Sequence, residues 1–138
     1  MNTEKARSFV VIMVIVALSA LVLRFAVMQI VRFNIEQNES SAQSILKLIS
    51  TALENYSKDH QGAFPGNLTA LTKTQSRYLD KDYTAFSSYR GYVYSCSKIE
   101  SSGYNCSAVP LICGLSGNTD FSVSTGNLFI SQKCPKRE

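Results

Sequence analysis

The feature that most constrains this chain is an apolar run near its N-terminus, RSFVVIMVIVALSALVLRFAVMQIVRF, residues 7–33. From Phe9 to Leu23 the run carries no charge, and after Arg24 it stays uncharged as far as Val31. A helix rises about 1.5 Å per residue, so such a run can cross a hydrocarbon layer roughly 30 Å thick. Arg24 can be accommodated because its long side chain can extend toward the lipid headgroups. The run therefore predicts one membrane-spanning helix.

A cleavable secretory signal is a second interpretation of this run, because it has a basic start and an apolar centre. Such a signal also needs small residues at a cleavage site, followed by a chain that is no longer apolar. Here residues 17–31, ALSALVLRFAVMQIV, continue the apolar run instead. This continuation disfavours a signal peptide, and with it a secreted enzyme. Two interpretations remain: a plain membrane anchor, or a helix that also holds subunits together.

The net charge of +4 is concentrated around the apolar run. Residues 1–32 contain four basic residues and one acidic residue: Lys5, Arg7, Arg24 and Arg32, against Glu4. The other ten of the 14 basic residues and nine of the 10 acidic residues follow, so the remainder is nearly neutral. This distribution indicates membrane lipid rather than nucleic acid as the partner. Because Lys5 and Arg7 precede the run, we expect a cytoplasmic N-terminus and an exported C-terminal part.

Helical character continues beyond the run, since the chain has no glycine before Gly62 and no proline before Pro65. Apolar residues recur at helical spacing, with polar residues between them: Ile45, Leu48, Ile49, Ala52, Leu53 and Tyr56, against Lys47, Ser50, Thr51, Glu54 and Asn55. The pattern predicts one long helix from about Arg7 to Lys58 whose second half is amphipathic. The alternative is two helices joined near residues 34–41, where polar residues gather.

The last third of the chain carries strand signals. GYVYSCS, residues 91–97, and GYNCSAV, residues 103–109, are separated by KIESSG, which is typical of a hairpin. FSVSTGNLFI, residues 121–130, predicts a second hairpin with its turn at residues 125–127. Four short strands after a helix predict an α+β fold, in which a small antiparallel sheet packs on the amphipathic half of the helix.

One stretch after the helix, NYSKDHQGAFPGNLTAL, carries a family resemblance together with the apolar helix before it. The order of features resembles type IV pilins and type II secretion pseudopilins, and the residues that carry it are Tyr56, Gly62, Phe64, Pro65, Leu68 and Leu71. The resemblance implies a pilin-like fold and a structural, non-enzymatic role in a type IV pilus, a type II secretion system or a related filament. It implies no cofactor.

The resemblance also implies a division of the chain. Residues 1–8 would be a short cytoplasmic leader-like segment, and residues 9–32 the transmembrane and assembly helix. Residues 33–60 would form the amphipathic half of that helix, and residues 61–138 the exported globular part. The implied location is the bacterial inner membrane, spanned once, with the C-terminal domain in the periplasm or in an extracellular filament.

Two positions depart from the family pattern. Family members are cleaved after a glycine that precedes a phenylalanine, and they carry a glutamate at the fifth mature position. Here Phe9 would be the first mature residue, so Ser8 stands in place of the glycine and Met13 in place of the glutamate. An unpaired charge inside an apolar fibre core is costly, and the missing glutamate is thought to pair there with a neighbour's terminal amine. Two explanations stay open: a minor subunit at a filament tip, or an uncleaved membrane anchor.

The resemblance implies a set of partners. These are other pilin-like subunits, an assembly ATPase, a polytopic platform protein and, if the chain is processed, a prepilin peptidase. Assembly would exchange lipid for like helices along an assembly helix that starts at Phe9. Small residues on that helix would permit close approach: Ala17, Ser19, Ala20 and Ala26.

Candidate catalytic and metal-binding residues are few. His60 is the only histidine, and we expect it in an exposed loop without a catalytic role. Asp120 is the only carboxylate in GLSGNTDF, which is too few oxygen ligands for a calcium site. Four cysteines could bind zinc, but they lack close Cys-x2-Cys pairs, so disulfides are favoured: Cys96, Cys106, Cys113 and Cys134.

Three cysteine pairings are open, and the first predicted hairpin favours one of them. If KIESSG closes that hairpin symmetrically, Ser97 faces Asn105 and Cys96 faces Cys106, close enough for a bridge. Cys113 would then pair with Cys134 and restrain the C-terminus. Such bridges suit an exported domain. The alternative function, a single-pass anchor that presents an exported binding or sensor domain and never polymerises, fits the same bridges.

Overall fold

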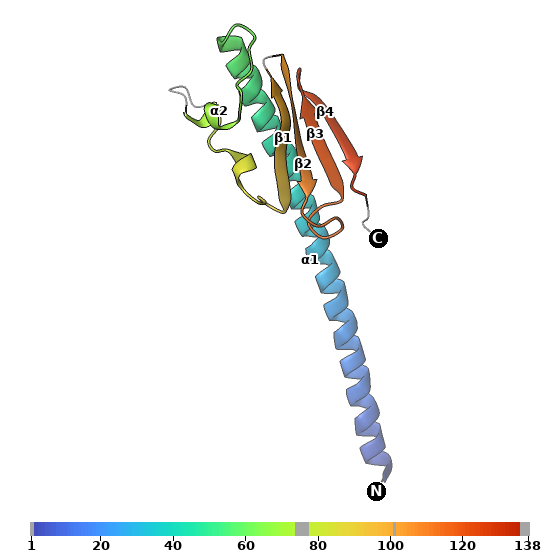
Figure 1. Ribbon diagram of the computed structural model, residues 1–138. Helices are drawn as coiled ribbons and strands as arrows, with labels where there is room; N and C mark the ends of the chain where they lie inside the picture. The colour runs from blue at the N-terminus through green and yellow to red at the C-terminus, as the bar shows by residue number, and fades with distance from the viewer. Residues whose placement is uncertain (1, 74–77, 101, 136–138) are drawn as a thin grey trace. The chain divides into compact units, whose positions relative to one another are not determined.

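The computed structural model describes residues 2–73, 78–100 and 102–135 (Figure 1). Met1 of the expected leader-like segment and residues 136–138 of the expected globular part lie outside the described residues. The elements, in chain order, are α1 (Asn2–Asp59), α2 (Thr69–Lys73), the short 3-10 helix η1 (Tyr83–Ala85), β1 (Tyr92–Glu100), β2 (Gly103–Pro110), β3 (Thr119–Ser124) and β4 (Leu128–Lys133). The predicted α+β fold, a long helix with a small antiparallel sheet, is confirmed.

Helix α1 is continuous from Asn2 to Asp59, so the prediction of one long helix is confirmed and the alternative of two helices is wrong. The helix ends where the backbone becomes left-handed, at Gln61 (φ 58°) and Gly62 (φ 90°). The Gly62 N–H donates to the carbonyl of Ser57 at 2.8 Å, a bond that satisfies one of the last free carbonyls of the helix. The chain nevertheless divides into two compact units, residues 1–34 and 35–138, and the division falls within α1. We refer to residues 35–138 as the head.

The sheet has four antiparallel strands in the order β1-β2-β3-β4, so the two predicted hairpins are confirmed (Figure 1). Strand β1 extends to Glu100, past the predicted end at Ser97, and Ser101 lies outside the described residues. Cys96 faces Cys106, but Lys98 faces Asn105, because a bulge follows Cys96. The expected symmetric pairing of Ser97 with Asn105 is therefore wrong. A bulge of this kind adds one residue to one strand and leaves it unpaired.

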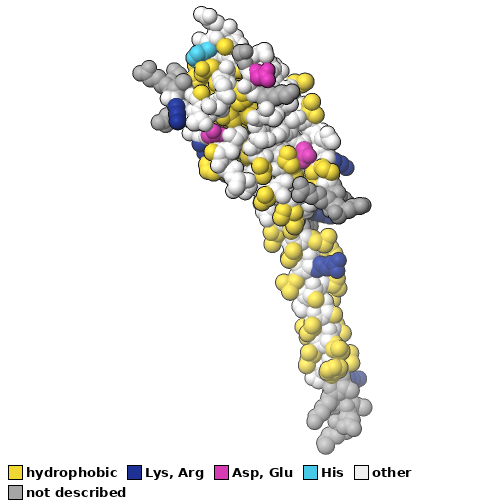
Figure 2. Space-filling view, in the orientation of Figure 1, with side chains coloured by type: hydrophobic (Ala, Val, Ile, Leu, Met, Phe, Trp, Pro, Cys, Tyr) yellow, Lys and Arg dark blue, Asp and Glu magenta, His cyan; other side chains and the backbone are white. Residues whose placement is uncertain are grey.

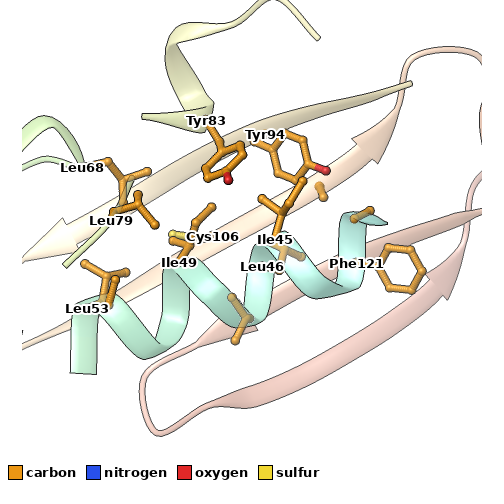
Figure 3. Close-up of a cluster of buried hydrophobic side chains, with 14 of the residues drawn as sticks. Ile45, Leu46, Ile49, Leu53, Leu68, Leu79, Tyr83, Tyr94, Cys106 and Phe121 are labelled. Atoms are coloured by element: carbon orange, nitrogen blue, oxygen red, sulfur yellow. The ribbon is translucent and has the colours of Figure 1, made fainter. Parts of the chain in front are cut away.

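The core of the head lies between the second half of α1 and one face of the sheet (Figure 3). Leu46, Ile49 and Leu53 are fully buried, and Ile45 and Ala52 lie beside them. From the sheet and its connections come these buried residues: Leu68, Leu71, Leu79, Tyr83, Tyr92, Tyr94, Tyr104, Cys106, Ala108, Phe121 and Val123. The predicted amphipathic half is thus the half of α1 that holds the head together.

Two residues of α1 lie on the opposite side from the one predicted. Leu48 was expected on the buried face but is 43% exposed, whereas Ser50 was expected on the polar face and is 1% exposed. Apolar residues at positions 45, 46, 48 and 49 cover most of a helical turn, so spacing alone does not decide which of them faces the sheet. The packing of α1 on the sheet buries Leu46 and leaves Leu48 partly exposed.

Ser50 is tolerated in the core because it belongs to a polar network that joins α1 to the sheet. Its hydroxyl lies 2.9 Å from the hydroxyl of Tyr104 and also donates to the side-chain oxygen of Asn127. The Tyr104 hydroxyl donates to a Glu54 carboxylate oxygen at 3.0 Å, and the Gly126 N–H donates to the same oxygen at 2.8 Å. A buried hydroxyl with satisfied bonds avoids the desolvation cost of an unpaired one. We call these five residues the Ser50 network.

The connection between α1 and β1 is fastened by Asp82. Its carboxylate accepts hydrogen bonds from the backbone and hydroxyl of Thr84, at 2.9 and 2.6 Å, and from the hydroxyl of Thr69 at 2.9 Å. Burial alone would raise the pKa of Asp82, but the hydrogen bonds from Thr84 and Thr69 outweigh it and lower the pKa below its ordinary value. The Asp82 carboxylate therefore ties α2 to η1 in its charged form.

We expect Asp82→Asn to reduce the stability of the head at neutral pH by up to about 1 kcal/mol. A carboxyl whose pKa is lowered by folding stabilises the fold above its unfolded pKa of about 4, and this contribution disappears as the pH falls through the folded pKa. The difference between wild type and variant in urea midpoint should therefore shrink from pH 7 to pH 3. The control is Glu100→Gln, at an exposed carboxylate. An Asp82→Asn difference that stays constant over this range would contradict the assignment.

Candidate functional site

The candidate site is the apolar segment of α1, residues 9–31, whose side chains are exposed along almost its whole length. Within the described residues, α1 is the one helix long and apolar enough to cross a membrane. Figure 2 shows its hydrophobic side chains along the surface, with basic side chains among them. Exposed apolar surface of this extent is not stable in water and requires lipid or other protein around it.

The two positions that depart from the family pattern lie within this helix. Ser8 and Phe9 are both helical and exposed, and Met13 lies one turn after Phe9 and is also exposed. Phe9 and Met13 therefore lie on one side of the helix, whereas Ser8 lies on another. Whether the chain is cleaved there remains a prediction.

The small residues of the apolar segment form two groups on the helix surface. At 3.6 residues per turn, Ala17 and Ala20 share one side with Arg24, whereas Ser19 and Ala26 share another side. The Ser19 hydroxyl donates to the carbonyl of Val16 at 2.8 Å, so it does not remain unpaired in an apolar surrounding. A second helix could approach closely at the small residues of either side, although Arg24 is a bulky side chain on the side of Ala17 and Ala20.

The four cysteines form two disulfides in the head. Cys96 and Cys106 join β1 to β2, with their Cα atoms 4.0 Å apart. Cys113 and Cys134 join the loop after β2 to the residue after β4, with their Cα atoms 6.1 Å apart. This is the pairing that the hairpin register favours. The second bridge fixes the end of β4 to the rest of the head.

The remaining candidate residues do not form a catalytic or metal site in the described part of the chain. His60 is exposed; its ring stacks on Tyr56 with 3.8 Å between ring centroids, and its Nδ1 lies 2.8 Å from the Tyr56 carbonyl oxygen. Asp120 has one buried carboxylate oxygen without a hydrogen-bond partner among the described residues, and burial raises the pKa of Asp120. No three potential ligand residues among those described lie close enough together to hold a metal ion.

Sequence reasoning missed the contacts between the start of the head's helix and the loop after β2. The side-chain amide of Asn38 donates to the carbonyl of Ser116 at 3.0 Å, and the Asn118 N–H donates to the Glu39 carboxylate at 2.7 Å. Asn38 and Glu39 lie in the polar stretch that was the candidate joint between two helices. Their polar side chains bind the loop after β2 and do not mark a break in the helix. The sequence signal for this contact was a polar stretch between two apolar parts of one helix.

The loop after β2 and the end of β4 border a groove of about 590 Å³ at one end of the sheet. Its walls are mainly apolar, and the lining includes Val109, Leu111 and Ile112. The unpartnered oxygen of Asp120 belongs to a residue of the same lining. The groove is open, and the bridge between Cys113 and Cys134 forms part of its wall.

Comparison with known proteins gives a structural similarity. No family model matches the chain, and no curated protein matches it. A crystal structure of the non-core minor pilin PilV of Neisseria meningitidis is similar over 78% of this chain and 94% of that chain, with 13% sequence identity and a TM-score of 0.49.

Proposed function

We propose that the chain is a structural, pilin-like or pseudopilin-like subunit that assembles into a filament through residues 9–32. The observation that carries the proposal is the composition of α1. Its first part exposes apolar side chains, and its second part forms the core of the head without a linker between them. A plain anchor needs no such continuity. A subunit whose helix must pack against like helices and also carry a head does need it.

The proposed mechanism is an exchange of contacts. Before assembly, residues 9–32 lie in the lipid of the inner membrane; during assembly they leave lipid for contacts with like helices. Lipid tails are as apolar as the helix, so close packing and not burial from water must favour the assembled state. Ala17 and Ala20 permit such packing on one side. The role is mechanical, and we propose no catalytic step.

The proposed partners follow from this mechanism. Other pilin-like subunits would contact the assembly helix, and an inner-membrane platform protein and an assembly ATPase would drive its transfer out of lipid. A prepilin peptidase would act between Ser8 and Phe9 if the chain is processed. The head would lie in the periplasm, or outside the cell once it is in a filament. The filament could serve secretion, adhesion, motility or DNA uptake.

The deciding experiment is the intact mass and N-terminal sequence of the protein purified from its own membranes. A chain that begins at Phe9 would support a processed pilin-like subunit despite Ser8 and Met13. A chain that begins at Met1 would favour a permanent anchor. A chain that begins after Ala20 would mean that the apolar run is a signal peptide and would overturn the proposal.

We expect Ala20→Phe to reduce incorporation into filaments by about tenfold, because a bulky ring prevents close helix approach. The matched control is Leu18→Phe, which adds a ring on the opposite side of the helix. Membrane levels of both variants, measured by immunoblot, should equal those of the wild type. Filament yield should fall only for Ala20→Phe. Equal yields for the two variants would contradict a packing role for this side.

The single-pass anchor is the second candidate function, and the specific observation that favours it is the loss of both family residues at Ser8 and Met13. Cross-linking separates the two functions. All four cysteines are in disulfides, so Ala20→Cys supplies a single free thiol in the apolar segment. A filament subunit should form dimers through this thiol under oxidation, whereas an isolated anchor should remain monomeric.

A further inference from the structure

The loop between β2 and β3, residues 111–118, presents a cluster of large apolar side chains to the outside of the head. Leu111, Ile112 and Leu115 are 56%, 53% and 57% exposed. We call this segment the apolar loop. Three exposed aliphatic side chains within five residues are unusual on a soluble surface, where such clusters mark interaction sites.

The apolar loop is held rigidly in place. The Leu111 N–H donates to the carbonyl of Gly91 at 2.9 Å, and the Ser116 N–H donates to the carbonyl of Ile112 at 2.9 Å. The bridge from Cys113 to Cys134 fixes the loop to the end of β4. The side chains are therefore presented by an ordered turn, so binding through them costs little conformational entropy.

The apolar loop lies at one particular end of the head. Its contacts with Asn38 and Glu39 fasten it to the start of the head's helix, since the head begins at residue 35. In Figure 1 the orange loop after β2 lies at the end of the sheet where β2 and β4 stop. The opposite end carries the turn between β3 and β4, where Gly126 bonds Glu54. The apolar loop is thus at the end through which the chain enters the head from the apolar segment.

Position and charge together indicate what contacts the loop. The apolar segment ends at Val31, and only roughly 10 Å of helix at the usual rise separates it from Asn38. That length is comparable to the headgroup layer on one side of a bilayer. Among the described residues that adjoin the loop or its contacts, the basic Arg90 and Lys133 are matched in number by the acidic Glu39 and Asp120. A contact made there would be apolar rather than electrostatic.

We propose that the apolar loop inserts Leu111, Ile112 and Leu115 into the interfacial layer of the bilayer that α1 spans. The loop is then a second membrane contact of the unassembled subunit and holds the head against the lipid surface. This inference rests on the proposed membrane location of residues 9–32. Amphipathic segments bind at this depth, where apolar side chains reach the acyl chains.

The chain contains no tryptophan, so one introduced tryptophan reports a single position. We would reconstitute three full-length variants into phosphatidylcholine vesicles whose acyl chains are brominated near the headgroup. Leu115→Trp reports the apolar loop. Leu128→Trp is the matched control, because Leu128 is 59% exposed and lies beside the turn at the opposite end of the sheet. Leu18→Trp reports the apolar segment itself.

We expect bromine to quench Leu115→Trp at least about twofold more than Leu128→Trp, with a blue shift only for Leu115→Trp. Zwitterionic lipid should suffice, because the contact is apolar. If Leu18→Trp is quenched in brominated vesicles and Leu115→Trp is not, the loop proposal fails and the membrane helix stands. If Leu18→Trp gives no quenching by lipids brominated at any depth, the proposed function itself fails. A blue shift of Leu115→Trp that depends on protein density, without bromine quenching, would assign the loop to another protein copy and overturn the lipid contact.

Discussion

Leu46→Ala is expected to lower the free energy of unfolding of the head by about 3 kcal/mol. Leu46 is fully buried between α1 and the sheet, and alanine would leave a cavity where the surrounding side chains are fixed by two elements. Denaturant unfolding of the full-length protein in detergent, followed by the near-ultraviolet circular dichroism of the tyrosines, would measure the effect.

The neighbouring Leu48 provides the matched control. It is the same residue type on the same helix, but it is 43% exposed, so Leu48→Ala should cost under about 1 kcal/mol. Similar losses for the two variants would mean that α1 packs on the sheet through a different face from the one described. The pair therefore tests the rotation of the helix directly.

Replacing both Cys113 and Cys134 by serine is expected to destabilise the head by about 3 kcal/mol. The bridge spans 21 residues of sequence, and its loss restores freedom to the unfolded chain while releasing the end of β4. Thermal unfolding would measure the loss. Limited proteolysis should then cut within residues 111–118, whereas the wild-type loop should stay intact.

The second bridge supplies the control for this prediction. Replacing both Cys96 and Cys106 by alanine should also destabilise the head, because the bridge spans 10 residues of sequence. It should leave residues 111–118 resistant to proteolysis, since β1 and β2 remain paired through their backbones. Cleavage of the loop in both variants would show that the Cys113 bridge has no special role in holding it.

The course of α1 could be predicted from the sequence because a helix needs few local conditions. No glycine precedes Gly62 and no proline precedes Pro65, so nothing interrupts the helix until the left-handed backbone at Gln61 and Gly62. The two hairpins could also be predicted from the sequence, because the alternation of apolar and polar residues and the turn residues between strands are local signals. The prediction that Cys96 faces Cys106 across the two strands followed from the first hairpin.

What the sequence left open depends on contacts between distant residues. Ser50 is buried only because Tyr104 and Asn127 offer partners more than fifty residues away, and Leu46 faces inward because the sheet covers that side. The bulge at Ser97 shifts the register after the cysteine pair, and no local signal marked it. The residues of the apolar loop have no regular apolar spacing, so the sequence did not predict where the loop lies. Its position became clear only from its hydrogen bonds with Asn38 and Glu39.

The continuity of α1 across the two units also determines how the molecule would carry mechanical load. Residues 9–32 and the part of α1 that packs on the sheet belong to one continuous helix, so a pull on residues 9–32 would reach the head through helical backbone. The load then falls on the buried side of α1 and on the Ser50 network, which share it among many small contacts. Tension on the helix is therefore opposed by the whole core of the head, and the sheet should detach from α1 only when that core unfolds.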